Sequence, residues 1–504
     1  MRTALGAGHG RLIRQCLTES AILALGGGTL GILFAAVGAR PFAAFWPGSL
    51  PRANEIHLDC RVLLFALAAS LLSGLLFGLA PALRAPVHHL ERALRAGART
   101  VTGSSRRLHG SFVISEMAIA VVLLIAAGML GRTLLRLSSL DPGFDPHDVL
   151  ITQVALSSEA LTNPVRTRAA WRDILDRVRH VPGVKSAAVA EVVPMGADTE
   201  EIGYWTSASP PPANQVPLAQ MNLVTPGYPK VMGFKLLQGR FFDEHDQIGN
   251  EPVVVIDTVM AQRAFGNQDP VGNRITLQFL GPTRVVGVVA HVRHFGLGVD
   301  DQASVRELIY IPFTQLPDPF VRLTSSGMSL LIRTAVPPLT VVQAVRREVR
   351  GATRDQAIYD VSTMEQRVHA SLARQRFLLL LFGIFGALAL LLACIGIYGV
   401  LAYLTNQRVP EFGVRMALGA SARDVMRMVF RQSLGMILLG SAIGIAASLA
   451  AGHVLEAQVA GLRPTDPLTY ITMICVLAAA ALFASFIPAH RASRVDPVKA
   501  LRQE

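Results

Sequence analysis

Long uninterrupted apolar stretches dominate the two ends of this chain. Six of them reach about 20 residues, the length at which a helix rising 1.5 Å per residue crosses the hydrocarbon core of a bilayer. The six stretches are Ser20–Ala39, Val62–Leu83, Phe112–Gly131, Phe377–Thr405, Ser433–Gly452 and Pro467–Ala489. Five contain no charged residue, and the third contains only Glu116. The pattern predicts an integral membrane α-helical protein with six transmembrane helices.

Between the third and fourth stretches, residues 136–376 form one large block of mixed polarity. Short runs rich in Val and Ile alternate there with amphipathic segments, which predicts a mixed α/β domain. The predicted strands are Val149–Leu156, Ser186–Val193, Pro252–Ile256, Arg274–Phe279, Arg284–Val289, Leu308–Ile311 and Ser329–Ile332, and the predicted helices are Thr167–Val181, Asp257–Phe265 and Thr340–Gly351. We expect Pro317–Ser326 to be a loop, and Thr363–Arg376 to be a helix that leads straight into the fourth stretch.

Composition and charge agree with a membrane protein. Of the 504 residues, 51% are hydrophobic and 16% are charged. The net charge of +12 suits a nucleic-acid partner, but its distribution does not. Segments 1–19, 84–111, 406–432 and 490–504 hold three, six, five and four Lys or Arg, whereas 40–61 and 453–466 hold three and one. Short basic loops stay in the cytoplasm. We therefore expect both termini inside, residues 136–376 in the periplasm, and no nucleic-acid partner.

The beginning of the chain recurs near its end. The residues that match are Arg2, Ala4, Leu5, Gly6 and Ala7 with Arg415, Ala417, Leu418, Gly419 and Ala420. A second echo follows, because Pro81-Ala82-x-Arg84-Ala85 matches Pro488-Ala489-x-Arg491-Ala492. Repeated membrane units are typical of transporters. The chain is therefore interpreted as a duplicated membrane unit.

Small residues four apart occupy equivalent positions in the two repeats. These helix-packing candidates are Gly27 and Gly31, Gly74 and Gly78, and Gly440 and Gly444. Small side chains allow helices to approach closely in lipid. The recurrence predicts close packing between the first and second span of each repeat.

The segment from Arg408 to Ala420 reads R-V-P-E-F-G-V-R-M-A-L-G-A. A basic loop next to the membrane explains its arginines but not the recurrence of part of this string. A surface helix with charged and small residues can enter a groove on a soluble partner. We therefore interpret it as a docking element for a cytoplasmic protein.

Several strings resemble MacB/FtsX-type ABC transporter permeases. Glu411-Phe-Gly-Val-Arg-Met-Ala-Leu-Gly-Ala is similar to the family's coupling segment, and Ser115-Glu116 through Asp141-Pro142-Gly143-Phe144-Asp145 is similar to the start of its repeat. The strings that resemble its periplasmic core domain are Val224-Thr225-Pro226-Gly227-Tyr228, Leu237-x-Gly239-Arg240-Phe241-Phe242 and Asp269-Pro270-Val271-Gly272. Two units in one chain resemble the duplicated permeases of soil bacteria.

The resemblance implies a domain organisation. Residues 1–109 would be the C-terminal part of a first FtsX-like repeat, with a coupling helix, two transmembrane helices and a cytoplasmic linker. Residues 110–135 would be the transmembrane helix that opens the second repeat. Residues 136–376 would be the MacB-like periplasmic core domain, and 377–504 a second FtsX-like permease domain with three transmembrane helices. Since the first repeat lacks its earlier elements, we expect an N-terminally truncated polypeptide.

The resemblance also implies a function: a permease subunit of an ABC-type export or mechanotransmission complex in the bacterial inner membrane. A separate ATPase would dock on Glu411, Gly413, Arg415, Ala417, Leu418, Gly419 and Ala420, and on Arg2, Ala4, Leu5, Gly6 and Ala7. A periplasmic adaptor or an outer-membrane channel would be a further partner. The sequence has no Gly-x4-Gly-Lys-[Ser/Thr], so we expect no enzyme activity and no cofactor, with ATP bound by the partner.

Two alternatives stay open: an FtsX-like regulator of a periplasmic partner such as a cell-wall hydrolase, and a decayed permease fragment. Glu116 is the one ionisable residue within a span, and is either functional or long enough to reach the headgroup layer. His291-x-x-His294 lacks further ligands at metal spacing. We therefore expect surface histidines and no metal.

Overall fold

The computed structural model describes residues 9–44, 59–83, 102–196, 200–207, 209–297, 306–325, 327–352, 357–418, 420–456 and 466–493. The chain forms two compact units. The first consists of Met1–Ala126, Leu381–Ser448 and Pro467–Glu504, and the second of Ala127–Leu380 and Leu449–Asp466.

The first unit is helical. Its helices lie wholly or mainly within it: α1 (His9–Ala44), α2 (Cys60–Leu83), α4 (Thr102–Ser138), α11 (Ala373–Gln407), α12 (Val409–Ala417), α13 (Ala422–Glu456) and α14 (Pro467–Ser493). Among the described residues, five helices are long and apolar enough to cross a membrane: Leu17–Gly38, Gly110–Ser138, Ala373–Gln407, Ala422–Gly452 and Pro467–Arg491. The sixth predicted span falls on α2, whose described apolar part, Cys60–Leu75, is shorter. Several apolar helices are confirmed, although not the count of six.

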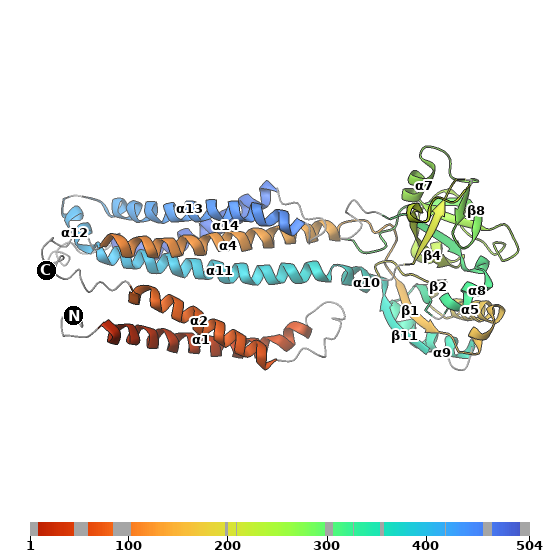
Figure 1. Cartoon of the computed structure of the whole chain (residues 1–504), viewed down its shortest axis with the longest axis horizontal. Coiled ribbons are helices and arrows are strands. Elements are labelled where there is room, and N and C mark those ends of the chain that lie inside the picture. Colours follow the sequence, from red (N-terminus) through yellow and green to blue (C-terminus); the bar gives the residue numbers. More distant parts are fainter. Residues whose placement is uncertain are drawn as a thin grey trace. The chain divides into compact units, whose positions relative to one another are not determined.

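Helices α4, α11, α13 and α14 run side by side (Figure 1). Close contacts hold neighbours together: Gly386 of α11 lies against Leu124 of α4, and the Cys394 thiol of α11 lies 3.6 Å from the Ala480 carbonyl of α14. Helices α1 and α2 pack on each other, and the Ser70 hydroxyl of α2 donates a hydrogen bond to the Ala24 carbonyl of α1 at 2.8 Å. Such hydroxyl-to-backbone bonds stabilise helix pairs in lipid.

The second unit contains an eleven-stranded mixed sheet. Its strands are β1 (Val149–Ala155), β2 (Val184–Ala190), β3 (Glu201–Trp205), β4 (Leu218–Val224), β5 (Leu236–Gly239), β6 (Val253–Asp257), β7 (Arg274–Leu277), β8 (Gly281–Val289), β9 (Leu308–Pro312), β10 (Ser329–Thr334) and β11 (Ala357–Thr363). Strands β11, β1, β10 and β2 form one antiparallel group, the four-stranded sheet. Strands β4, β3, β7, β8, β6 and β9 form the six-stranded ring, which closes because β9 pairs with both β6 and β4. Strand β5 pairs with β8.

The join between these two halves is short. Only Ala190 of β2 and Val224 of β4 are paired in the ladder. Backbone hydrogen bonds flank this position, from Glu191 N to Leu223 O and from Thr225 N to Val189 O, both at 3.0 Å. The Thr225 hydroxyl accepts from Val189 N at 2.9 Å. Side-chain bonds thus replace further strand pairing at this point.

Helices cover the sheet. They are α5 (Pro164–Arg179), α6 (Tyr228–Met232), α7 (Thr258–Phe265), α8 (Asp318–Thr324), α9 (Val342–Ala352) and α10 (Met364–Ser371). Helix α5 begins where the Asn163 side chain accepts a hydrogen bond from Val165 N at 2.8 Å. It buries Trp171, Ile174 and Val178 in the domain core. A mixed α/β domain is therefore confirmed.

Two local predictions were wrong. The segment Pro317–Ser326 is not only loop, because Asp318–Thr324 forms α8 with a proline in its first turn. The segment Thr363–Arg376 is not one helix. Thr363 ends β11 and forms a capping box with Gln366 at the start of α10. Helix α10 ends at Ser371, and α11 begins at Ala373.

Candidate functional site

Helix α12 carries the predicted docking segment. Its Phe412 is 2% exposed and lines a crevice with Leu404 of α11 and Val429 of α13. Burying this ring contributes on the order of 2 kcal/mol. Because Phe412 is buried in a crevice that residues of α11 and α13 also line, it anchors α12 to the helical unit.

The opposite side of α12 is exposed. Arg415 and Glu411 form an ion pair with a nitrogen–oxygen distance of 2.8 Å, and the Arg415 Nη1 also lies 3.2 Å from the Met428 sulfur. Leu418 is 82% exposed at the end of the helix. Its amide donates to the Val414 carbonyl, and the Ala420 amide donates to the Arg415 carbonyl at 2.9 Å. The turn therefore presents an apolar side chain beside a charged pair.

The other docking candidates divide into two groups. Ala417 ends α12 and is exposed, and Gly413 lies within the same helix. Gly419, and the first-repeat residues Arg2, Ala4, Leu5, Gly6 and Ala7, lie outside the described residues.

Gly440 and Gly444, two of the predicted helix-packing glycines, lie close to a neighbouring helix. A Cβ on Gly440 would lie 2.6 Å from the Met117 Cβ, and one on Gly444 would lie 2.6 Å from the Val121 Cβ. Both contacts join α13 to α4, whereas the sequence predicted a contact between α13 and α14. Periodicity shows that a helix has a small-residue face but not which neighbour covers it.

In the first repeat, Gly74 of α2 approaches Ala24 of α1. On α1 it is Gly28, and not Gly27 or Gly31, that faces α2, since a Cβ on Gly28 would lie 3.1 Å from the Ser70 hydroxyl. Gly78 lies within α2. Gly27 and Gly31 have open space around them in the described part of the chain.

Glu116 lies between two spans. Its carboxyl group lies against Gly396 of α11, where the absence of a side chain leaves room for the Glu116 Oε2. The Oε2 is buried and has no hydrogen-bond partner among the residues that the structure describes. The side chain therefore packs between helices.

In the His291-x-x-His294 string, His294 is buried and His291 is half-buried, so the expectation of two surface histidines was wrong. His294 is 1% exposed, and burial, with a smaller effect from His291, lowers its pKa to about 4. The His291 Nδ1 is hydrogen-bonded to the carboxylate of Asp257, whose other oxygen caps α7 by accepting from Met260 N. No group of three metal-ligating side chains occurs in the described ranges.

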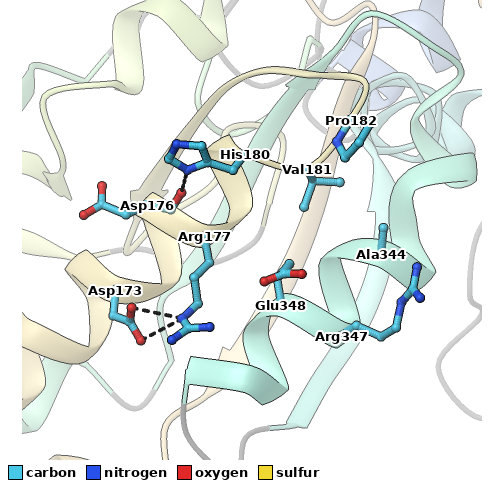
Figure 2. A pocket seen from close by; sticks show the side chains of 9 residues that line it. All are labelled: Asp173, Asp176, Arg177, His180, Val181, Pro182, Ala344, Arg347 and Glu348. Atoms are coloured by element: carbon cyan, nitrogen blue, oxygen red, sulfur yellow. Dashed lines mark hydrogen bonds and ion pairs between the residues drawn. The ribbon is translucent and has the colours of Figure 1, made fainter.

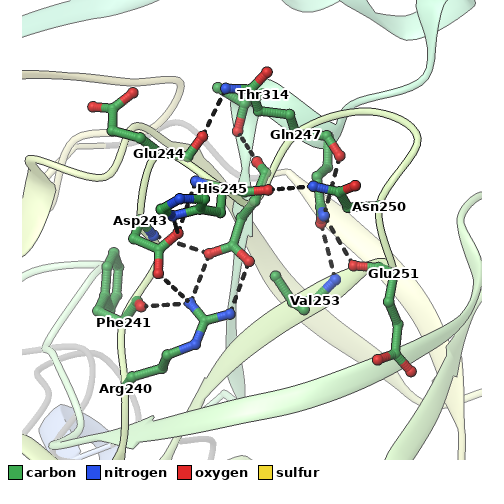
Figure 3. A network of polar contacts seen from close by, with 12 residues as sticks. Arg240, Phe241, Asp243, Glu244, His245, Gln247, Asn250, Glu251, Val253 and Thr314 are labelled. Atoms are coloured by element: carbon green, nitrogen blue, oxygen red, sulfur yellow. Dashed lines mark hydrogen bonds and ion pairs between the residues drawn. The ribbon is translucent and has the colours of Figure 1, made fainter.

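The string Gly239-Arg240-Phe241-Phe242 builds a polar clamp (Figure 3). The Arg240 guanidinium holds both carboxylate oxygens of Asp246, at 2.7 and 2.9 Å. Burial opposes ionisation of Asp246, but the hydrogen bonds from Arg240 and from Asp243 N outweigh it and lower its pKa. Gly239 has a φ of 69°, and a Cβ there would lie 2.2 Å from the Val286 carbonyl. The clamp fixes the loop that follows β5.

A groove of about 550 Å³ separates α5 from α9 (Figure 2). Its side chains come from both helices and the turn after α5: Asp173, Asp176, Arg177, His180, Val181, Pro182, Ala344, Arg347 and Glu348. The Arg177 Nε donates to both oxygens of Asp173 at 3.0 Å. Acidic and basic groups are nearly balanced, so the groove offers no concentrated charge to an ionic ligand.

Sequence comparison places these features in a family. Residues 113–352 match the profile of the MacB-like periplasmic core domain, and residues 383–497 match that of the FtsX-like permease C-terminal domain. The chain belongs to the MacB/FtsX-type ABC transporter permeases. The apolar helices and the periplasmic-domain family make this permease a multi-pass inner-membrane protein.

Two relatives of this permease illustrate the similarity. The macrolide export ATP-binding/permease protein MacB of Bordetella avium (strain 197N) is 27% identical over 346 residues, which cover 65% of this chain and 51% of the relative. The pyoverdine export ATP-binding/permease protein PvdT of Pseudomonas syringae pv. tomato is 27% identical over 282 residues, covering 55% and 42%. The chain thus spans about half the length of the curated relatives it matches.

Solved structures include similar domains. The periplasmic region of MacB from Actinobacillus actinomycetemcomitans is 14% identical, with a TM-score of 0.30, and covers 46% of this chain and 94% of that one. The extracellular domain of the noncanonic ABC-type transporter YknZ from Gram-positive bacteria is 16% identical, with a TM-score of 0.27, and covers 42% and 100%.

Sequence reasoning missed the Arg240–Asp246 clamp and the Asp257–His291 pair. For the first, the string that resembles the family contains Arg240, but it ends before its partner Asp246. The second joins residues 34 apart in sequence, and no local pattern connects them.

Proposed function

We propose that this chain is the permease subunit of an ABC-type export complex, in which a separate ATPase chain docks on α12 and its ATP hydrolysis drives movement of the α/β domain. Both relatives named above are described as export ATP-binding/permease proteins. This chain, in contrast, has no Gly-x4-Gly-Lys-[Ser/Thr] string. In the proposed complex, another chain supplies ATP hydrolysis.

The exposed face of α12 supports this proposal most strongly. Leu418 is 82% exposed on a segment outside the candidate spans, and the Glu411–Arg415 pair lies one turn away. Apolar side chains beside directional charges are typical of protein-binding surfaces. Since Phe412 is buried against both neighbouring helices, a partner that moves α12 would move α11 and α13 with it.

The proposed orientation places α12 and both termini in the cytoplasm and residues 136–376 in the periplasm, where an adaptor or an outer-membrane channel would receive the substrate. The charge distribution supports this orientation. It is tested by adding a protease to intact spheroplasts. Cleavage within 136–376, with a tag inserted after Leu418 left intact, would support it, and the reverse pattern would contradict it.

Docking is tested with the full chain in lipid nanodiscs and the ABC ATPases encoded by the same genome. Leu418→Glu places a charge at the centre of the proposed contact and is expected to weaken ATPase association at least tenfold. Leu339→Glu is the matched control, because Leu339 is also exposed, at 54%, but lies in the α/β domain. Equal association of wild type and Leu418→Glu, or no association of any of these ATPases with wild type, would overturn the proposal.

A further inference from the structure

A second cleft of about 480 Å³ lies in the α/β domain between α5 and the loops of the six-stranded ring. Its volume is in the range of small-molecule sites, about 300–1,000 Å³. The residues that line it are Val165, Arg168, Ala169, Trp171, Arg172, Leu175, Asp176, Arg179, Thr225, Pro226, Glu244, Gln247, Ile248, Phe313 and Thr314. We infer that this cleft binds a small amphiphilic carboxylate. The inference rests on the proposed export function, because it names the class of substrate that would be exported.

The positive charge of the cleft comes from one stripe of α5. Arg168, Arg172 and Arg179 lie at spacings of four and seven, on one side of the helix. Arg168 is already engaged, because its Nη2 donates to the Leu316 carbonyl at 2.7 Å and to the Asp318 carboxylate at 2.8 Å. It stabilises the wall and has little capacity left for a ligand.

The other two arginines are available. The guanidinium of Arg172 makes no ion pair or hydrogen bond within the part of the chain that the structure describes. Arg179 has only an exposed pair with Asp176 at 3.3 Å, an interaction that contributes little to stability. Its guanidinium reaches across the cleft, since a Cβ on Gly227 would lie 3.6 Å from the Arg179 Nη2. Arg172 has no carboxylate partner among the described residues, so its guanidinium is the group of the cleft that an anionic ligand would contact.

The remaining walls are apolar. Trp171, Leu175 and Phe313 are buried at the base of the cleft, and Val165 and Ile248 are exposed at its rim. Large exposed apolar side chains around a concave surface favour a ligand with an apolar body. A guanidinium beside such walls suits a carboxylate attached to that body.

The cleft also spans the short join between the two halves of the domain. Helix α5 packs on the four-stranded sheet, whereas Thr225 and Pro226 follow β4 of the ring. The opposite wall, with Glu244 and Gln247, belongs to the loop held by the Arg240–Asp246 clamp (Figure 3). A ligand that contacts both walls would link the two halves and restrict their relative motion.

The test uses the full chain in lipid nanodiscs, with 2-naphthoate as the probe and its neutral amide as the matched comparison. Binding is detected by saturation-transfer NMR, and empty nanodiscs give the background. Saturable binding of the carboxylate is expected, with at least tenfold weaker binding of the amide. Arg172→Gln combined with Arg179→Gln should weaken carboxylate binding at least tenfold, and Ala169→Trp should block the cleft. Arg166→Gln is the control, since Arg166 lies on the same helix but outside the cleft.

The assignment is overturned if the carboxylate shows no saturable binding beyond empty nanodiscs, if the amide binds equally well, or if neither the double variant nor Ala169→Trp changes its binding. The result is distinguishable from a failure of the proposed function. Loss of probe binding with intact ATPase association would remove only the cleft assignment. Probe binding without any ATPase association would remove the export function and leave the site.

Discussion

Reversing the charges of the Glu411–Arg415 pair separates partner docking from helix stability. The two side chains are 42% and 44% exposed, with 2.8 Å between Arg415 Nη2 and Glu411 Oε1. An exposed pair of this kind contributes about 0.3–0.5 kcal/mol. Arg415→Glu removes it and adds a like-charge repulsion of similar size, so the single variant destabilises α12 by about 1 kcal/mol at most.

A charge pair buried in a protein–protein interface contributes more to binding than an exposed pair within a helix contributes to stability. Removing one partner of a hydrogen-bonded charge pair that is buried in an interface costs about 2–5 kcal/mol, which corresponds to at least about a thirtyfold loss of association. If the ATPase contacts this face, Arg415→Glu should therefore weaken its association with the chain by at least that factor. The effect exceeds anything that loss of the intrahelical pair would cause.

The double variant Glu411→Arg with Arg415→Glu completes the experiment. It restores an opposite-charge pair within the helix but presents reversed signs to the partner. Association is measured by titrating labelled ATPase against the chain in nanodiscs, with the ATP hydrolysis rate as a second readout. Both variants should bind weakly. Full recovery in the double variant would show that Arg415 only stabilises the helix, and wild-type binding by both would refute the docking role.

Three further predictions concern packing and protonation. Gly440→Leu should destabilise the helical unit by about 1–3 kcal/mol, because a Cβ there lies 2.6 Å from the Met117 Cβ. Gly435 lies on the same helix but has open space around it, so Gly435→Leu should leave the melting temperature of the protein in detergent unchanged. Equal melting temperatures of the two variants would contradict the α4–α13 contact. Asp246→Asn should cost about 1.5–3 kcal/mol at pH 7 by weakening the clamp. Since the folded pKa of Asp246 lies below its ordinary 3.8, the difference from wild type should shrink as the pH falls below 3.8, and a constant difference in denaturant unfolding would contradict this. Folded His294 has a pKa of about 4 against 6.5 when unfolded, so its neutral form supports the fold fully above pH 6.5. Unfolding measured from pH 7 to 4 should show a loss of up to about 3 kcal/mol towards pH 4, and His294→Leu should flatten this slope. An equal slope in both proteins would show that His294 is not responsible.

The apolar stretches and the α/β alternation could be predicted because each depends on residues that are close in sequence. Strand β6 is a buried run of Val and Ile, and β10 contains the buried run Leu330, Leu331 and Ile332; both were found. Strand β5, Leu-Leu-Gln-Gly, is exposed throughout and has no alternation to reveal it. Most of the site depends on distant contacts. The burial of His294, the pairing of Arg240 with Asp246 and the approach of α13 to α4 are set by tertiary packing, which no local pattern encodes.

The short β2–β4 join has a mechanical consequence. Backbone ladders resist shear because every paired residue must break directional bonds together, whereas apolar packing is non-directional and tolerates small sliding. Here the two halves share continuous hydrophobic cores but only one ladder position. The side chains of Asn222 and Thr225 supply the neighbouring bonds, and side chains can follow a displacement by changing rotamer. The domain should thus withstand being pulled apart far better than being twisted, which makes this seam its most compliant point under load.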